Sequence, residues 1–154
     1  FLEGFFKENP EAYVLEFGSG ASTLWIAQRT PNLYSVEHAP SWYTKIGEKL
    51  KESGAEHVHY VLAERPYYTV CDEFPDDFFD LIIVDGRNRK GCIAHSIPKL
   101  KPGGILMLDN AERARYRDVL PLMEGWKHVS SEQTKPDAFG FYYRGWRTDW
   151  WVKG

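Results

Sequence analysis

The stretch "YVLEFGSGAST" (residues 13–23) decides the fold of this chain. Its first five residues are apolar or aromatic except for Glu16, a composition that indicates a buried β-strand. Gly18 and Gly20 follow, and the sequence then reads as a helix from Ser22 to Arg29. A strand that turns through glycines into a helix is typical of the first unit of an α/β ligand-binding sheet.

Strand-like and helix-like segments alternate along the rest of the chain. Further strands are expected at 33–37, 57–62, 79–84 and 105–109, and helices at 41–54, 91–100 and 112–124. The segment "FDLIIV" (79–84) is continuously apolar, as in a strand that is covered on both faces. The alternation therefore predicts an α/β fold, with a mostly parallel sheet and helices on both faces, in a single domain over residues 1–154.

Local signals refine the ends of these elements. Ser41 can cap the start of the helix at 41–54, and Gly54 can close it. Asp109 and Glu112 form a capping-box pattern, so the helix after them should continue at least to Pro121. The aromatic-rich end of the chain predicts antiparallel strands at one edge of the sheet, at 127–131, 139–143 and 148–152.

Composition and charge narrow the classes of function. The net charge of −3 argues against a protein that holds nucleic acid by neutralising phosphates. No apolar run approaches the roughly 20 residues that span a bilayer, and nothing resembles a signal peptide, so we expect a cytoplasmic protein without a membrane partner. The chain begins with Phe1 rather than Met, which is consistent with a missing N-terminal segment. Oligomeric state is left open.

The glycine corner and the end of the second strand form a candidate ligand site. Glu37 ends that strand, where a carboxylate can accept two hydrogen bonds from a ribose diol. The hydroxyls of Ser19, Ser22 and Thr23 suit the carboxylate of an amino acid, and Glu16 suits an ammonium group. Dinucleotide-binding enzymes are disfavoured, because Thr23 stands where their fingerprint has a third glycine. A simple glycine turn beside a solvated Glu37 is the alternative.

Four segments together resemble a known family. They are "EFGSGAST" (16–23), "YSVEH" (34–38), "FDLIIVDG" (79–86) and "LKPGGILMLDN" (100–110). Their order and spacing are similar to those of the class I S-adenosylmethionine-dependent methyltransferases. The resemblance implies a Rossmann-like, doubly wound sheet of seven strands with a reversed last strand, and S-adenosylmethionine as the cofactor.

The same resemblance implies roles for residues at matching positions. Glu16, Gly18 and Gly20 match the loop around the methionine moiety, and Glu37 matches the ribose ligand. Ala63 and Glu64 fall where the third strand of the family reaches the adenine. His38, which follows Glu37, is either a further contact to the adenine or a partly exposed loop residue. Asp85 matches the acidic residue that lies beside the transferable methyl group.

Asp85, Asp109 and Asn110 also resemble the metal site of enzymes of the catechol O-methyltransferase type. Two carboxylates and an amide oxygen suit Mg²⁺, which in those enzymes promotes ionisation of a substrate hydroxyl. Those enzymes have a lysine three residues after the first aspartate, where this chain has Asn88, so Lys90 is the candidate base nearby. The alternative is that Asp109 starts a helix without any metal.

These residues lead to two hypotheses of different classes. The first is an S-adenosylmethionine-dependent methyltransferase that methylates an oxygen of a small-molecule acceptor, with Mg²⁺ as a possible second cofactor. The second is a non-catalytic domain that binds S-adenosylmethionine or a related nucleoside. Arg87 and Arg89 suit an anionic substrate better than a catalytic base, and the basic segment "ERARYR" (112–117) is either a solvated face or a surface for a negatively charged acceptor.

Overall fold

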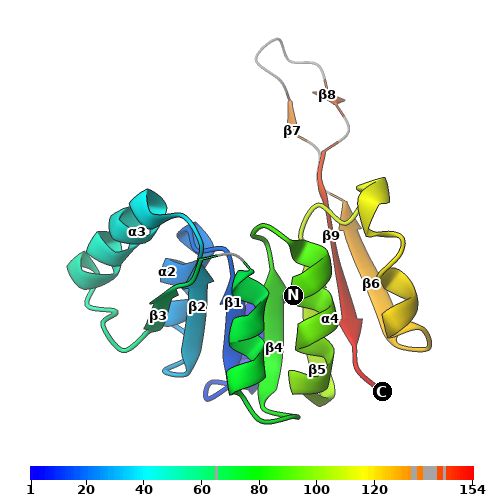
Figure 1. Cartoon of the computed structure of the whole chain (residues 1–154), viewed down its shortest axis with the longest axis horizontal. Coiled ribbons are helices and arrows are strands. Elements are labelled where there is room, and N and C mark those ends of the chain that lie inside the picture. Colours follow the sequence, from blue (N-terminus) through cyan, green and yellow to red (C-terminus); the bar gives the residue numbers. More distant parts are fainter. Residues whose placement is uncertain (65, 133–134, 137–141, 144) are drawn as a thin grey trace.

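A sheet of seven strands runs through the whole structure, a computed structural model that describes residues 1–64, 66–132, 135–136, 142–143 and 145–154 (Figure 1). The strand order is β3-β2-β1-β4-β5-β9-β6. The strands are β1 (Val14–Phe17), β2 (Leu33–Glu37), β3 (His59–Leu62), β4 (Phe79–Val84), β5 (Leu100–Leu108), β6 (Lys127–Glu132) and β9 (Arg147–Val152). Strand β9 is antiparallel to both of its neighbours, and the neighbouring pairs among β1 to β5 are parallel. The expected fold class is confirmed, reversed last strand included.

The central strands are buried on both faces, as their apolar runs predict. All four residues of β1 are buried, and in β4 only Asp80 is partly exposed. Strand β1 pairs in parallel with β2 and with β4, so its end lies between the ends of both neighbours. This topology places the corner after β1 in the middle of the carboxyl edge, which is the upper edge of the sheet in Figure 1.

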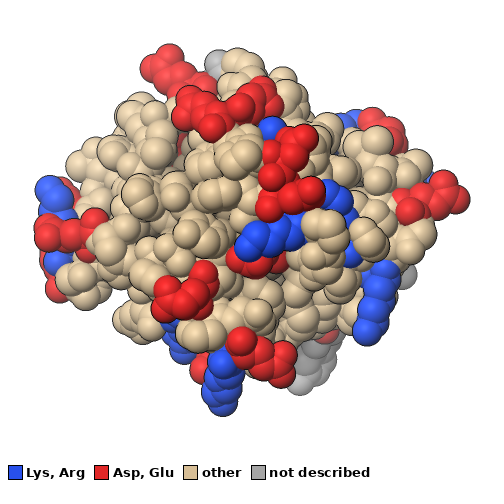
Figure 2. Space-filling view, turned by 90° about the horizontal axis from the view of Figure 1, so that it is seen from below, with Lys and Arg blue, Asp and Glu red and all other residues tan. Residues whose placement is uncertain are grey.

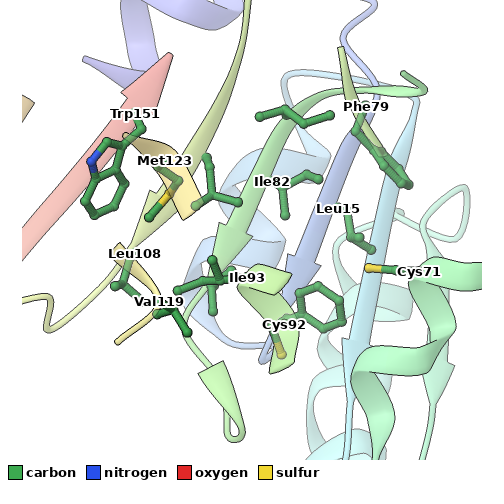
Figure 3. Close-up of a cluster of buried hydrophobic side chains, with 14 of the residues drawn as sticks. Leu15, Cys71, Phe79, Ile82, Cys92, Ile93, Leu108, Val119, Met123 and Trp151 are labelled. Carbon is green, nitrogen blue, oxygen red and sulfur yellow. The ribbon is translucent and has the colours of Figure 1, made fainter. Parts of the chain in front are cut away.

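Side chains alternate between two hydrophobic cores on the two faces of the sheet. Leu15 and Ile82 belong to the first core, together with residues of α4 (Arg89–Ser96), η1 (Tyr67–Glu73) and η4 (Leu120–Met123) (Figure 3). Val14 and Leu81 belong to the second core, together with residues of α1 (Leu2–Glu8), α2 (Ala21–Ala27) and α3 (Pro40–Glu52). Both layers are needed to cover the sheet, because its central strands carry no polar face.

Helix α3 begins one residue earlier than expected. Pro40 is its first residue, which suits proline because the ring fixes φ and the missing N–H has no helical partner there. Ser41 is therefore not the cap; that position belongs to Ala39, which has an extended backbone. Gly54 follows the helix with φ of 69°, so the expected glycine closure is present.

The helix expected at 112–124 is wrong. The structure has two short 3₁₀ turns there, η3 (Ala114–Tyr116) and η4. Asn110 has a left-handed backbone (φ 51°) and Arg113 is extended, so no helix can start from Asp109. Glu112 accepts a hydrogen bond from the backbone N–H of Arg147 (3.0 Å) instead of completing a capping box.

Other boundaries differ by smaller amounts. The expected helix at 91–100 is α4 followed by the turn η2 (Ile97–Lys99), and β5 starts at Leu100 rather than 105. The short strands β7 (Lys135–Pro136) and β8 (Tyr142–Tyr143) pair with each other, while residues 139–141 of the strand expected at 139–143 lie outside the described residues. Within the described part of the chain, no helix combines the length and apolar character needed to cross a membrane.

Candidate functional site

A cleft of about 520 Å³ lies at the carboxyl edge of the sheet, a size that suits a cofactor or small ligand. Its wall includes residues that follow β1, β2 and β4: Gly18, Ser19, Glu37, His38 and Asp85. These residues are far apart in the sequence, and the parallel pairing of three strands brings them together. The cleft therefore combines backbone, hydroxyl and carboxylate groups in one place.

Two glycines allow the strand ends to approach each other beneath the cleft. Gly18 has φ of 96°, and a Cβ there would lie 2.7 Å from Cα of Gly86, the residue after Asp85. Gly20 is different, because its backbone is extended and a Cβ would meet nothing within 4 Å. Gly18 is thus required by the fold, whereas the missing side chain of Gly20 leaves open space.

Glu37 is almost fully buried, and its carboxylate fastens two loops. One oxygen accepts hydrogen bonds from the backbone N–H (3.1 Å) and the hydroxyl (3.0 Å) of Ser19. The other accepts from the backbone N–H groups of His38 (2.8 Å) and Ala39 (2.9 Å). These four hydrogen bonds fill the roughly four acceptor sites that a carboxylate offers. A ribose diol can therefore bind to Glu37 only if the Ser19 hydroxyl gives up its hydrogen bond.

Ser19 is held from several directions in turn. Its hydroxyl lies 2.7 Å from the hydroxyl of Tyr60, and its carbonyl accepts a hydrogen bond from the indole of Trp42 (2.7 Å). Burial raises the pKa of Tyr60 to about 12, so this phenol stays protonated and can share a hydrogen bond with Ser19. Trp42 also lines the cleft and is partly exposed there.

Glu16, Ser22 and Thr23 lie together below the corner and not on the cleft wall. Glu16 is fully buried and accepts hydrogen bonds from Ser22 (2.5 Å), Thr23 (2.5 Å) and Ser35 (2.7 Å). Burial raises the pKa of Glu16, and the three hydroxyls oppose that effect. Two of the hydroxyls expected to receive a ligand carboxylate, those of Ser22 and Thr23, thus donate to Glu16 and join α2 to β1, while Ser35 joins β2 to β1.

Ala63 and Glu64 follow β3. The backbone N–H of Ala63 donates to the carbonyl of Glu37 (2.9 Å), and its side chain packs against the first core. Glu64 is exposed. Neither residue contributes to the wall of the cleft.

Arg89 is a buried cation between the ends of β4 and β5. Its guanidinium donates to the carboxylate (2.9 Å) and the carbonyl (2.9 Å) of Asp85, to the carbonyl of Gly86 (2.9 Å) and to the carbonyl of Asp109. Arg89 is only 8% exposed, and these contacts use four of its five N–H groups. Arg89 therefore joins the two strand ends, a structural role that differs from the substrate-binding role suggested by the sequence.

The carboxyl of Asp85 is the most perturbed acid on the cleft wall. Partial burial, followed by the nearby charge of Asp109, raises its pKa to about 7, although Arg89 acts in the opposite direction. The Asp85 side chain is still 46% exposed, so it can reach a molecule in the cleft. A carboxylate with such a pKa can accept a proton near neutral pH.

Lys90, the other candidate base, forms an exposed ion pair with Asp118 at 2.5 Å. It lines a neighbouring hollow with Arg87 and Asn88, and it is not on the wall that Glu37 and Asp85 share.

The expected metal ligands fit Mg²⁺ poorly in this arrangement. Asp85 and Asp109 do follow adjacent strands, but the Asp85 carboxylate already pairs with Arg89, which contacts Asp109 through its backbone carbonyl. One oxygen of Asp109 accepts a hydrogen bond from Thr148 (2.9 Å). Among the residues that the structure describes, no group of three or more His, Cys, Asp or Glu side chains is arranged to hold a metal.

The comparisons with known proteins identify the family of the chain. A family model described as a methyltransferase domain matches residues 15–111, which is more than half of the chain. The chain belongs to this methyltransferase family. It is therefore an S-adenosylmethionine-dependent methyltransferase. No curated protein matches the sequence.

Solved structures share the fold of this methyltransferase. An O-methyltransferase from Bacillus cereus in complex with S-adenosylhomocysteine has a TM-score of 0.75 at 16% identity, over 99% of this chain and 79% of that one. A precorrin-6y C5,15-methyltransferase from Geobacter metallireducens has a TM-score of 0.73 at 18% identity, over 94% and 81%. An rRNA methylase from Streptococcus thermophilus has a TM-score of 0.71 at 13% identity, over 99% and 93%. At these identities the likeness concerns the fold alone.

Several residues on the cleft wall of the methyltransferase had no assigned place in the sequence-based site. They are Ala39, Trp42, Gly86, Arg113 and Arg115. The basic segment 112–117 was the only signal for the last two, because their place depends on how the chain turns after β5. Trp42 had no signal of its own, since an apolar residue at a helix start normally indicates core packing.

Proposed function

We propose that this methyltransferase methylates an oxygen atom of a small molecule. S-adenosylmethionine would lie in the cleft, with its ribose at Glu37 and its methyl group facing Asp85. The observation that carries this proposal is the shared wall of the cleft, where the glycine corner, Glu37 and Asp85 meet. The cofactor supplies a methyl group that is already activated by attachment to a sulfonium sulfur.

The protein's own residues bind the acceptor, orient it and remove the proton from its hydroxyl group. The corner at Gly18 and the fastened loop of Ser19 give a rigid wall, so the acceptor can be aligned with little loss of freedom. Asp85 faces the open part of the cleft and takes the proton of the acceptor hydroxyl. A hydroxyl needs this help more than an amine does, because it is a weak nucleophile until it loses its proton.

Mg²⁺ assistance is the less favoured form of this proposal. Arg89 pairs with the Asp85 carboxylate and donates to the backbone carbonyl of Asp109, so we infer that the protein's own guanidinium balances the charge of Asp85 where related enzymes would need a cation. Turnover should therefore persist in excess EDTA and should not rise when Mg²⁺ or Mn²⁺ is added. Loss of activity on chelation, with recovery on adding Mg²⁺, would instead assign Asp85, Asp109 and Asn110 as metal ligands.

Cofactor binding is tested by titration calorimetry with S-adenosylhomocysteine. Glu37→Gln removes the charged acceptor, and hydrogen bonds to charged groups contribute about 1.5–3 kcal/mol, so affinity should fall roughly 10- to 100-fold. Glu52→Gln, an exposed change at the end of α3, is the matched control and should bind like the wild type. Thermal unfolding of each variant shows whether the cleft is intact.

The reaction itself is tested by release of S-adenosylhomocysteine with phenol, catechol and sugar acceptors. Turnover with a hydroxyl acceptor, and none with its methyl ether, supports oxygen as the target. Equal turnover of an amine analogue would contradict the assignment to oxygen. Tight cofactor binding without turnover of any acceptor, RNA included, would indicate a binding domain.

A further inference from the structure

Basic side chains from two separate loops line the cleft next to Asp85. Arg87 lies in the loop after β4, and Arg113 and Arg115 lie in the segment after β5. All three are exposed. The cleft that would hold the cofactor therefore has a positively charged side.

These arginines differ in their partners from Arg29, Arg89 and Arg147. Each of those three has a carboxylate at short range: Arg29 with Glu3 (3.1 Å), Arg89 with Asp85 (2.9 Å) and Arg147 with Asp149 (2.8 Å). Each of these pairs neutralises its own guanidinium within the protein.

No such neutralisation occurs at the cleft within the described part of the chain. Arg113 reaches only Glu112, at 3.9 Å, and neither Arg87 nor Arg115 has a carboxylate within ion-pair distance among those residues. Arg115 donates to the hydroxyl of Tyr116 (2.8 Å), which holds its direction and leaves its charge in place. Guanidinium groups of this kind are suited to bind carboxylate or phosphate through paired hydrogen bonds.

The excess positive charge is local. The whole chain has a net charge of −3. On the opposite edge of the molecule, basic and acidic side chains lie next to one another (Figure 2), and ion pairs such as Lys101–Asp80 (2.7 Å) and Lys153–Asp77 (3.1 Å) belong to the amino end of β4 and the strands beside it. Lys90, which lies beyond Arg87, is neutralised by Asp118. The arginines thus form a compact group at one cleft and not a stripe that could follow a nucleic-acid backbone.

Four arginines outnumber Glu37 and Asp85 on the cleft wall, and an excess of positive charge is unfavourable beside a sulfonium group unless an anion balances it. We propose that the acceptor is a small molecule that carries a carboxylate or phosphate group, which Arg113 and Arg115 hold while its hydroxyl faces Asp85. This inference rests on the proposed function. As the acceptor oxygen forms its bond to the methyl carbon, the carbon–sulfur bond breaks with its electron pair left on sulfur, and the hydroxyl proton passes to the Asp85 carboxylate.

The test is binding of matched probes to the complex of the enzyme with S-adenosylhomocysteine. The pairs are 3,4-dihydroxybenzoate with 3,4-dihydroxybenzamide, and ribose 5-phosphate with ribose, measured by titration calorimetry. In at least one pair the anion should bind about tenfold more tightly than its uncharged partner, as expected for a charge-assisted bidentate contact. The preferred pair distinguishes carboxylate from phosphate.

Two variants test whether the arginines of the cleft cause the preference for the anionic probe. In the double variant Arg113→Gln/Arg115→Gln the preference should fall below threefold, while S-adenosylhomocysteine still binds. Arg117→Gln is the matched control, because Arg117 is exposed on the same segment but does not line the cleft. It should keep the full preference.

Three results would overturn the inference. They are equal affinity for the members of both pairs, no binding of either anion at millimolar concentration, and a preference that survives in the double variant. Tighter binding of a short single-stranded RNA than of either anion would indicate that the acceptor is a nucleic acid and not a small molecule. Failure of S-adenosylhomocysteine to bind the wild type is a separate outcome, which would remove the proposed function itself.

Discussion

At the scale of single residues, Asp85 combines exposure to the cleft with a pKa near neutrality. The cause is its position, because partial burial and the adjacent Asp109 both disfavour the charged form while Arg89 favours it. Asp85 should lose its proton as the pH rises through about 7.

The first prediction concerns activity. If Asp85 accepts the acceptor's proton, kcat should rise with pH and level off above about 7. Asp85→Asn should lower kcat by about 10²- to 10⁴-fold, the usual contribution of a general base, and remove this limb. Lys90→Met should leave the profile in place, because Lys90 is paired with Asp118 away from the shared wall. If the rise of kcat with pH shifted in the Lys90 variant and not in the Asp85 variant, Lys90 would be the base.

The second prediction concerns stability. The folded-state pKa of Asp85 is raised from 3.8 to about 7, so the folded protein binds more protons than the unfolded chain between these values. This group therefore stabilises the fold less as pH rises from about 4 to 7. Thermal unfolding from pH 4.5 to 8.5 should show the wild type losing Tm relative to Asp85→Asn. Parallel curves for the two proteins would contradict the raised pKa.

At the scale of elements, the two glycines in the corner between β1 and α2 have different roles. The fold requires Gly18, whereas Gly20 leaves space for the proposed ligand. Gly18→Ala should destabilise the protein by about 1–3 kcal/mol, because its positive φ and its contact with Gly86 leave no room for a methyl group. Gly20→Ala should keep its free energy of unfolding, since its backbone is extended and the space beside it is open.

The prediction is therefore a difference between two neighbouring glycines. Gly20→Ala should fold normally and lose affinity for S-adenosylhomocysteine by tenfold or more, because the methyl group takes space next to the proposed cofactor. Urea unfolding and calorimetry on both variants are the measurements. Unchanged affinity in a stable Gly20→Ala protein would place the cofactor away from this corner.

The strands also show how much of the fold and of the site could be predicted from the sequence. The strands β1, β2 and β4 were predicted from their apolar runs, because burial on both faces leaves a strong signal. The site residues Gly18, Glu37 and Asp85 were expected at one edge, since parallel strands bring their carboxyl ends together. Signals of this kind depend only on residues close in the sequence and on one topological rule.

Contacts over long distances explain what the sequence could not give. The helix expected after Asp109 fails because Glu112 and Ala111 bond to the backbone of Arg147, which lies on a distant strand. Helix α1 had no capping signal, and it is held by packing of Phe6 on the second core. Arg89 was read as a substrate ligand, since only the fold reveals that its partners are backbone carbonyls.

At the scale of the whole molecule, the two hydrophobic cores lie on opposite faces of one sheet, and its central strands contribute residues to both. Ile93 of α4 lies in the first core and Ile46 of α3 in the second, and both cores include residues of the same central strands. We therefore expect the chain to unfold as one cooperative unit, in keeping with the single domain inferred from its sequence.

Two conservative variants test this unity. Ile46→Val and Ile93→Val each remove one buried methyl group, so each should lower the free energy of unfolding by about 0.5–1.5 kcal/mol. The two sites lie on opposite sides of the sheet, so the double variant should show the sum within about 0.5 kcal/mol. Urea unfolding followed by tryptophan fluorescence and by far-ultraviolet circular dichroism should give coincident curves for all three proteins. Curves that separate, or a transition that shifts for one probe and not the other, would show that the two faces of the sheet unfold independently.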